Sequence, residues 1–360
     1  MTMTQTRTIQ VAPGRMLTVT PVYETYWRFA MKRQEVFVRR VGGLPPPWTD
    51  DPVIAAHRFT NVYRASDRVS QYLIRHVLYQ GPQSAEEIFF RTLLFKFFNR
   101  INTWEELSGE VGAPTWKTFD FDRYARALDK ILARGERIYS AAYIMPSPSF
   151  GHARKHRNHL RLLESIMTDG TPSRVGRARS LKDVFDVLRG YRSLGDFLAF
   201  QFTIDLNYSA MIDFAEMDFV VAGPGAKAGI GKCFADTAGL SHEDVIRAMA
   251  DRADHEFRRF GLPFCRLWGR GLQLIDCQNL FCEVDKYARI VHPEIQSSTG
   301  RTRIKQRFLP RATPIPQWYP PKWHLNVDAA LSVSNANAVR ANQSTPLAPA
   351  LVEGYRAGAM

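Results

Sequence analysis

The sequence predicts a mostly α-helical protein, built from one large domain or two closely packed ones. Apolar residues recur at helical spacing along most of the chain, whereas the alternating pattern of strands is scarce. The chain has 360 residues, of which 45% are hydrophobic, so it can bury a large core. We expect a flexible arm over residues 1–20, a helical domain over residues 21–325 and a disordered tail over residues 326–360, where aromatic residues almost vanish.

Capping residues and clusters of Gly or Pro set the expected helix boundaries. Helical spacing predicts helices over residues 24–40, 51–79, 84–99, 121–136, 154–167, 180–188, 195–214 and 272–289. Ser84 and Glu87 form a capping-box pattern, and Thr103 starts a short helix with the same pattern. The stretch PRATPIPQWYPPKWHLN, which follows Lys305, is too rich in proline for regular structure, so we expect an extended segment there.

Composition points to a polyanionic partner. The net charge of +13 favours DNA or RNA, because Lys and Arg gain affinity by releasing counterions from phosphates; a merely basic, soluble enzyme is the alternative. The four cysteines contain no CxxC pair, which argues against a zinc ribbon or a four-cysteine iron–sulfur site and fits reduced thiols in the cytoplasm. We find no signal peptide and no apolar run long enough to cross a membrane.

A polar stripe interrupts the otherwise apolar stretch LQLIDCQNLFCEVDKYAR. Asp276, Asn279, Glu283 and Lys286 recur at steps of three and four, which places them on one face of a helix. A buried carboxylate costs several kcal/mol unless it is paired, so Asp276 and Glu283 need a partner or a use. The stripe is either the wall of a catalytic pocket or a structural feature in which Lys286 pairs with Glu283.

A second helix carries a similar polar edge. In FLAFQFTIDLNYSAMIDF, the side chains of Gln201, Asp205 and Tyr208 share one face, and Asn207 lies beside it, while apolar residues cover the rest. Buried polar groups are costly unless they are hydrogen-bonded or functional. The two polar helices could therefore face one another across a pocket.

The glycine-rich stretch FVVAGPGAKAGIGKCF, residues 219–234, predicts a hairpin between helices. A dinucleotide-binding loop would need a strand before it, and the residues that precede this stretch are helical in pattern. In a helix–hairpin–helix, glycines let the backbone approach a phosphate, and the next helix offers free N–H groups. The phosphate-binding candidates here are Gly223, Gly225, Lys227, Gly229 and Lys232. An ordinary interhelical turn is the alternative.

Arginines beside aromatic residues provide further candidates for nucleic-acid contact. Arg33, Arg64 and Arg68 lie in blocks rich in Tyr, Trp and Phe, and Trp27 could stack on a base. Core aromatics beside surface arginines are the commoner explanation of any single residue of this kind. The basic stretches over residues 173–182 and 300–307 are typical of phosphate-contacting loops, although charge runs are often only solvated.

Several of these stretches together resemble one family. They are YWRFAMKRQEVFVRR, TNVYRASDRVSQYL, FFNRINTWE, FQFTIDLNYS, AGPGAKAGIGKCF and LIDCQNLFCEVDKYAR. As a set, over residues 23–289, they are similar to helical proteins linked to hypermodified DNA bases: the helical domain found with 5-hydroxymethyluracil DNA kinases, and the related alpha-glutamyl/putrescinyl thymine pyrophosphorylase-like or amino-acid:DNA transferase clades. The resemblance implies a DNA-glycosylase-like helix–hairpin–helix fold.

The resemblance leaves two chemistries open. Some relatives act in anti-phage defence as DNA glycosylases that remove glucosylated hydroxymethylcytosine, and we expect this activity first: base flipping and hydrolysis of the base–deoxyribose bond to leave an abasic site. The alternative is an amino-acid or polyamine:DNA transferase that replaces pyrophosphate on activated 5-hydroxymethyluracil, with Lys227, Lys286 or Arg289 holding the leaving group. A silent DNA-binding protein is the third possibility. The sequence contains no GxxxxGK[ST] loop, so we do not expect the kinase reaction itself.

For the glycosylase we expect Asp276 or Glu283 as the catalytic carboxylate, with Asp205 in reserve. No VDTH-like segment follows the hairpin, so the usual catalytic Asp of helix–hairpin–helix glycosylases has no counterpart. The expected base-binding residues are Gln201, Asn207, Tyr208, Gln278, Asn279, Lys286 and Trp27. We expect DNA as the partner, with no metal, no cofactor, no membrane and no obligate protein partner.

Overall fold

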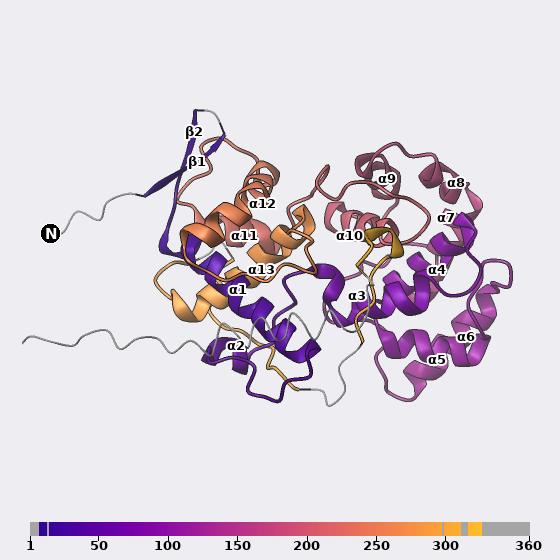
Figure 1. Cartoon of the computed structure of the whole chain (residues 1–360). Helices are drawn as coiled ribbons and strands as arrows, with labels where there is room; N and C mark the ends of the chain where they lie inside the picture. Colours follow the sequence, from indigo (N-terminus) through magenta and orange to yellow (C-terminus); the bar gives the residue numbers. More distant parts are fainter. Residues whose placement is uncertain (1–6, 13, 297–298, 311–315, 326–360) are drawn as a thin grey trace, which may run out of the picture.

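The helices form two groups that lie side by side (Figure 1). The computed structural model describes residues 7–12, 14–296, 299–310 and 316–325. The first group contains β1 (Thr8–Ala12), β2 (Arg15–Thr18), α1 (Pro21–Val41), α2 (Pro52–Ala56), α11 (Pro224–Cys233), α12 (His242–Arg259) and α13 (Leu274–Val291). The second contains α4 (Ala85–Phe98), α5 (Ile101–Val111), α6 (Phe121–Ala133), α7 (Lys155–Thr168), α8 (Thr171–Gly176), α9 (Leu181–Arg189) and α10 (Asp196–Asn207). The predicted mostly-α class is confirmed.

Short elements join the two groups. They are η1 (Arg64–Ser66), α3 (Arg68–Leu73), the π-helical turn η2 (Ile74–Leu78) and the 3₁₀ turn η3 (Pro321–Trp323). The single helix predicted over residues 51–79 is therefore wrong. Residues 58–63 form a non-helical loop whose backbone binds distant carboxylates. The N–H of Thr60 donates to Glu283 at 3.2 Å, and the N–H of Arg64, directly after the loop, donates to Asp276 at 2.8 Å. These side chains compete with helical hydrogen bonds for the same donors.

Helix α11 packs against α13 at very close range. A Cβ atom added to Gly229 would overlap the carbonyl of Phe281, and one added to Gly225 would overlap the Sγ of Cys282. The glycines are therefore needed for helix–helix contact within the fold. The glycine-rich stretch is mostly helix, with Gly223 as the N-cap of α11, and the helix–hairpin–helix assignment stays a prediction.

The second group is organised around α4, which is buried on nearly all sides. Ser84 caps this helix by accepting the N–H of Glu87, as the sequence predicts, but Glu87 itself accepts the N–H groups of Trp116 and Lys117 and does not complete the box. Thr103 does not start a helix: α5 begins earlier, at Ile101, because the Thr103 hydroxyl donates to a distant carbonyl instead.

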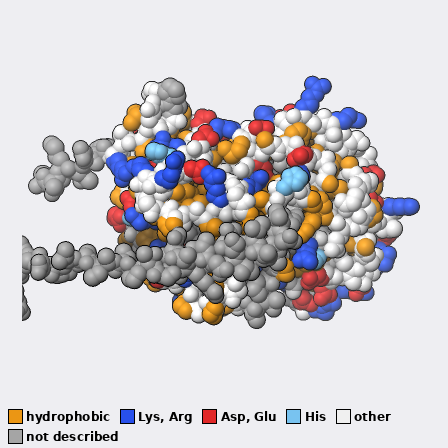
Figure 2. Space-filling model, in the orientation of Figure 1, with side chains coloured by type: hydrophobic (Ala, Val, Ile, Leu, Met, Phe, Trp, Pro, Cys, Tyr) orange, Lys and Arg blue, Asp and Glu red, His pale blue; other side chains and the backbone are white. Residues whose placement is uncertain are grey.

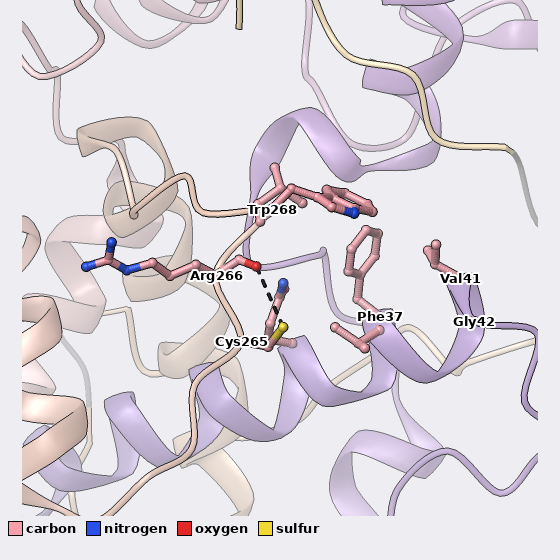
Figure 3. A pocket seen from close by; sticks show the side chains of 9 residues that line it. Phe37, Val41, Gly42, Cys265, Arg266 and Trp268 are labelled. Carbon is pink, nitrogen blue, oxygen red and sulfur yellow. Dashed lines mark hydrogen bonds between the residues drawn. The ribbon is translucent and has the colours of Figure 1, made fainter. Parts of the chain in front are cut away.

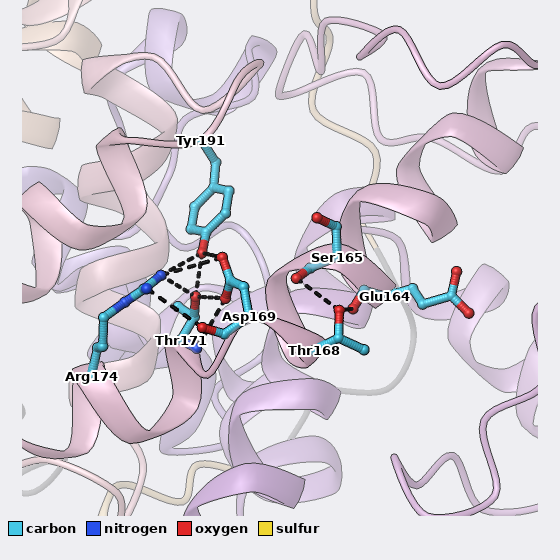
Figure 4. A network of polar contacts seen from close by, with 7 residues as sticks. All are labelled: Glu164, Ser165, Thr168, Asp169, Thr171, Arg174 and Tyr191. Atoms are coloured by element: carbon cyan, nitrogen blue, oxygen red, sulfur yellow. Dashed lines mark hydrogen bonds and ion pairs between the residues drawn. The ribbon is translucent and has the colours of Figure 1, made fainter.

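A polar network fixes the turn between α7 and α8 (Figure 4). Arg174 donates to Asp169 at 3.3 Å, to the Thr171 hydroxyl at 2.8 Å and to the Tyr191 hydroxyl at 2.7 Å. Tyr191 and Thr171 also donate to Asp169. Because Tyr191 follows α9, this network joins three consecutive helices of the second group.

Two strands lie within the stretch for which the sequence predicts a flexible arm. Strands β1 and β2 pair antiparallel and β1 contacts α12, with Ile9 and Leu17 buried in the core. Helix α12 has no counterpart among the predicted helices, although the capping box of Ser241 and Asp244 marks its start.

Residues 316–325 of the proline-rich segment pack over the junction of the two groups and contain one 3₁₀ turn. The N–H of Trp318 donates to Gln71 at 2.7 Å, the hydroxyls of Tyr319 and Ser66 are 2.8 Å apart, and Lys322 donates to the carbonyl of Ser209 at 3.0 Å. The tail predicted over residues 326–360 lies outside the described residues.

The α11–α13 contact predicts opposite effects for two glycine substitutions in one helix. Gly229→Ala should destabilise the protein by about 1–3 kcal/mol, because the new methyl group meets the backbone of Phe281. Gly231→Ala has open space around it, so it should stabilise α11 by about 0.5–1 kcal/mol through its better helix propensity. Urea denaturation of both variants measures the difference, and equal stabilities would contradict this packing.

Candidate functional site

The two carboxylates of the α13 stripe are buried; Glu283 binds the loop that precedes η1, and Asp276 binds the first residue of η1. Asp276 is 4% exposed; it accepts the N–H of Arg64 at 2.8 Å and that of Gln273 at 3.0 Å. Glu283 is 5% exposed; it accepts the N–H of Thr60 and pairs with Lys286 at 2.6 Å. Burial raises the pKa of Asp276 to about 6, against the lowering effect of these two N–H groups. The stripe therefore has the paired arrangement of a structural feature.

Arg64 connects this stripe to the second helix group. Its guanidinium donates two hydrogen bonds, of 2.7 and 3.0 Å, to the carboxylate of Asp205 in α10 and one of 3.0 Å to Gln201. Lys96 of α4 pairs with the same carboxylate at 2.9 Å. We call these four residues, Arg64, Asp205, Gln201 and Lys96, the Arg64 cluster.

The Arg64 cluster is closed to solvent, and its one carboxylate, Asp205, pairs with two cations. All four of its residues are at most 3% exposed. Burial alone would raise the pKa of Asp205, but the charges of Arg64 and Lys96 outweigh it and hold that pKa below its ordinary value. Asp205 therefore stays ionised with both oxygens occupied, which favours a structural role over the catalytic one predicted for it.

Two amide atoms, one on α10 and one on α13, have no hydrogen-bond partner among the described residues. They are Nε2 of Gln201 and Oε1 of Gln278, on side chains that are 1% and 2% exposed. Gln278 lies beside Gly223, and Gln201 accepts from the hydroxyl of Tyr143 at 3.2 Å. Unsatisfied buried amides call for an explanation. These two are the predicted base-binding residues that the geometry supports best.

The other predicted base-binding residues are occupied or enclosed. Trp27 is fully buried against Phe257. The side-chain amide of Asn207 donates to the carbonyl of Phe214 and accepts the N–H of Phe214. These bonds hold a turn after Asn207, so α10 ends there and does not reach the predicted residue 214. The ring of Tyr208 is covered by Trp323. Asn279 is partly buried and Lys286 is held by Glu283.

The predicted phosphate-binding residues are divided between surface and interior. Lys227 and Arg68 are exposed, whereas Lys232, Arg33 and Arg64 are buried. Lys232 lies 3.6 Å from Asp285 of α13, and Arg33 donates to Asn61 at 2.5 Å. The structure does not bring these residues together into one phosphate-binding surface.

A different set of basic residues does converge, around an open cavity of 560 Å³. Its basic lining residues are Arg58, Lys286, Arg289, Arg301, Arg303 and Lys305. Lys286 and Arg289 pair with Glu283 and Asp285. The other four have no carboxylate within ion-pair distance in the described ranges. We call this site the cationic cavity. The charge run over residues 300–307 predicted it in part, but nothing in the sequence indicated Arg58.

A second open cavity, of 580 Å³, is also partly basic: Arg137, Arg154 and Lys155 line it, but Glu136 lines it as well and Arg154 pairs with Asp129. On the face shown in Figure 2, basic side chains are interspersed with acidic and apolar ones. The cavity between α1 and the loop at Cys265–Trp268 is drawn in Figure 3; its 20 Å³ is about enough for one water molecule. In the described part of the chain, no helix is both long enough and apolar enough to cross a membrane.

Comparison with known proteins identifies relatives. Residues 20–297 match the family described as the helical domain of 5-hmdU DNA kinase. A 5-hmdU DNA kinase of Bacillus phage SP10 is 27% identical over 286 residues, which cover 74% of this chain and 45% of the phage protein. The chain thus spans less than half the length of that relative. No solved structure matches it.

These comparisons correct the predicted reaction class. The relative is named as a kinase, an enzyme that transfers a phosphoryl group, and not as a hydrolase of the base–sugar bond. The prediction of a DNA N-glycosylase is therefore wrong. The predicted link to hypermodified DNA bases is confirmed.

The Arg64 cluster predicts a large effect of one isosteric substitution. Asp205→Asn would leave the buried cations of Arg64 and Lys96 without a counter-charge, so stability should fall by about 3–5 kcal/mol. Asp186→Asn, in an exposed pair with Lys182, is the matched control and should change stability by less than about 1 kcal/mol. Urea denaturation compares them; similar small losses would contradict the role of the cluster.

The raised pKa of Asp276 predicts a pH dependence of stability. Its value is about 6 in the folded protein, above the ordinary value. Between about pH 4 and pH 6 the folded state binds more protons at this carboxyl, so its contribution to stability falls as the pH rises. The difference in unfolding free energy between wild type and Asp276→Asn should decrease across this range. Parallel pH profiles would contradict a buried, weakly acidic Asp276.

Proposed function

This chain belongs to the family of 5-hmdU DNA kinase helical domains, and we propose that it binds DNA that carries 5-hydroxymethyluracil and takes part in modifying that base. The family and the phage relative support this substrate. The modification leaves the base–deoxyribose bond intact and takes place at the exocyclic hydroxymethyl group.

The cationic cavity is the observation that carries the proposal. Four of its basic side chains, Arg58, Arg301, Arg303 and Lys305, have no neutralising carboxylate among the described residues. Such a cluster attracts phosphates, because each contact releases counterions from the DNA backbone. Low-dielectric walls on one side of a cavity also focus the field of the charges. DNA phosphates are the ligand that this arrangement suits best.

The chemistry that fits this cavity is group transfer with a phosphorylated leaving group. On a pyrophosphorylated 5-hydroxymethyluracil, an amine would form a C–N bond to the methylene carbon, the C–O bond would break, pyrophosphate would leave and the amine would lose a proton. Lys286 and Arg289 line the cationic cavity and could stabilise the pyrophosphate charge. This transferase reaction is the finer part of our proposal.

The role of the cationic cavity is testable by DNA binding. Arg301→Ala with Arg303→Ala should weaken binding to any DNA sequence and reduce the slope of log affinity against log salt by about one per lost phosphate contact. Lys182→Ala, an exposed lysine of α9 in the other helix group, should leave both unchanged. Fluorescence anisotropy across a salt series measures the slopes. Identical slopes for the double variant and wild type would refute DNA binding in this cavity.

The chemistry is testable on defined oligonucleotides. The protein is incubated with DNA that carries 5-hydroxymethyluracil, its pyrophosphorylated form or thymine, with an amino acid or putrescine present, and the nucleosides are analysed by mass spectrometry. We expect an amine adduct on the pyrophosphorylated base and tighter binding to either modified DNA than to thymine DNA. Abasic sites, or equal binding of all three DNAs, would refute the proposal.

A further inference from the structure

A second cavity lies next to the cationic cavity and has a different lining. It has a volume of 210 Å³ and is enclosed by the C-terminal half of α1, the loop before α2 and the chain around Phe308. Its walls include the aromatic rings of Trp48, Phe59 and Phe308 together with Arg33, Arg40 and His57. We call it the aromatic cavity.

The aromatic walls have fixed positions. The rings of Trp48 and Phe308 meet edge to face at 6.4 Å, and the guanidinium of Arg40 lies 5.0 Å from the first and 5.8 Å from the second. The indole N–H of Trp48 donates to the carbonyl of Leu44 at 2.7 Å. Rings and guanidinium planes arranged in this way are the surfaces on which proteins stack unpaired bases.

Two polar atoms of the lining have no partner. Nη1 of Arg33 and Nδ1 of His57 are buried without a hydrogen bond among the described residues. Arg33 is only 7% exposed, and its other terminal nitrogen already donates to Asn61. A buried donor without an acceptor is destabilising. Nη1 of Arg33 is closed to solvent as it stands, so Arg33 suits a ligand that brings an acceptor once its side chain turns toward the cavity. The edge of a pyrimidine offers carbonyl acceptors for Arg33 and a further polar group for His57.

The backbone joins the two cavities. The N–H of Arg58 donates to the carbonyl of Gln306, and the N–H of Phe308 donates to that of Ala56, both at 3.0 Å. Arg58 and Gln306 line the cationic cavity, whereas Phe308 lines the aromatic one. Lys286, from the cationic cavity, also lies 5.5 Å from the ring of Phe59 in the aromatic cavity. A nucleotide could therefore place its phosphates in one cavity and its base in the other.

We propose that the aromatic cavity receives an unstacked pyrimidine of a DNA strand whose phosphates lie in the cationic cavity. This inference rests on the proposed function and adds the place of base recognition. Trp48, Phe308 and Arg40 stack on the base, and Arg33 donates to one of its carbonyl oxygens. Recognition at this site is separate from the α10 and α13 residues that the sequence singles out.

The test compares two single-stranded oligonucleotides that differ at one position. One carries 5-hydroxymethyluracil there, and the other carries a tetrahydrofuran abasic analogue with the same phosphates. Wild type should bind the first about tenfold more tightly, since stacking of a single base on aromatic side chains has this effect. Trp48→Ala and Phe308→Ala should each reduce that ratio towards one, while Trp48→Phe preserves most of it. Phe150→Ala, an exposed aromatic in the second helix group, should leave the ratio unchanged.

The outcomes separate this inference from the proposed function. If Trp48→Ala and Phe308→Ala keep the full ratio, the base binds elsewhere and the inference fails, although DNA binding stands. If neither oligonucleotide binds, the proposed function fails first. Free 5-hydroxymethyldeoxyuridine monophosphate is the third probe, and affinity equal to that of the oligonucleotide would overturn a DNA-strand ligand. Photo-crosslinking of 5-iodouracil DNA identifies the residues next to the base. Adducts on Trp48 or Phe308 support the cavity, and adducts confined to α10 or to the N-terminal half of α13 overturn it.

Discussion

The fold depends on the ion pair between Arg64 and Asp205. Arg64 sits in the short turn between the two helix groups, its N–H is held by Asp276 of α13, and its guanidinium is held by Asp205 of α10. Buried charges are tolerable only when every partner is in place, so this pair requires both helix groups to dock in one arrangement. Asp276 from the polar stripe of α13 and Gln201 from the polar edge of α10 complete the hydrogen bonding of Arg64.

The buried carboxylates are bound to other residues of the fold, which leaves them poorly placed for catalysis. Asp276, Glu283 and Asp205 each have at least two partners, so the carboxylates with the most suggestive sequence pattern serve the fold. Groups without a counter-charge or a hydrogen-bond partner among the described residues include basic residues around the cationic cavity, Arg33 and His57 in the aromatic cavity, and the amides of Gln201 and Gln278. Both cavities border on the segment from Gly300 to Phe308, which packs against the residues after α2.

The sequence predicts those helices whose boundaries depend on residues close to them in the chain. Helical periodicity and caps located α1, α4 and α13, and the basic run over residues 300–307 indicated part of the cationic cavity. The break within residues 51–79 could not be predicted, because the carboxylates that cause it are more than 200 residues away in sequence. Likewise Trp48, His57 and Phe308 carry no motif; only folding brings them together. The glycines of α11 carry an ambiguous sequence signal, since close helix packing and phosphate binding demand the same residue.

Hydrogen–deuterium exchange with and without DNA that carries 5-hydroxymethyluracil tests the account most directly. Binding at the two cavities should slow exchange of amides over residues 44–60 and 300–308, which line them. Amides at the N-terminal ends of α11 and α13, near the unpartnered Gln278, should exchange at unchanged rates. Protection confined to α10, α11 and α13, with none in the two cavity segments, would contradict the account and restore the interior site between the helix groups.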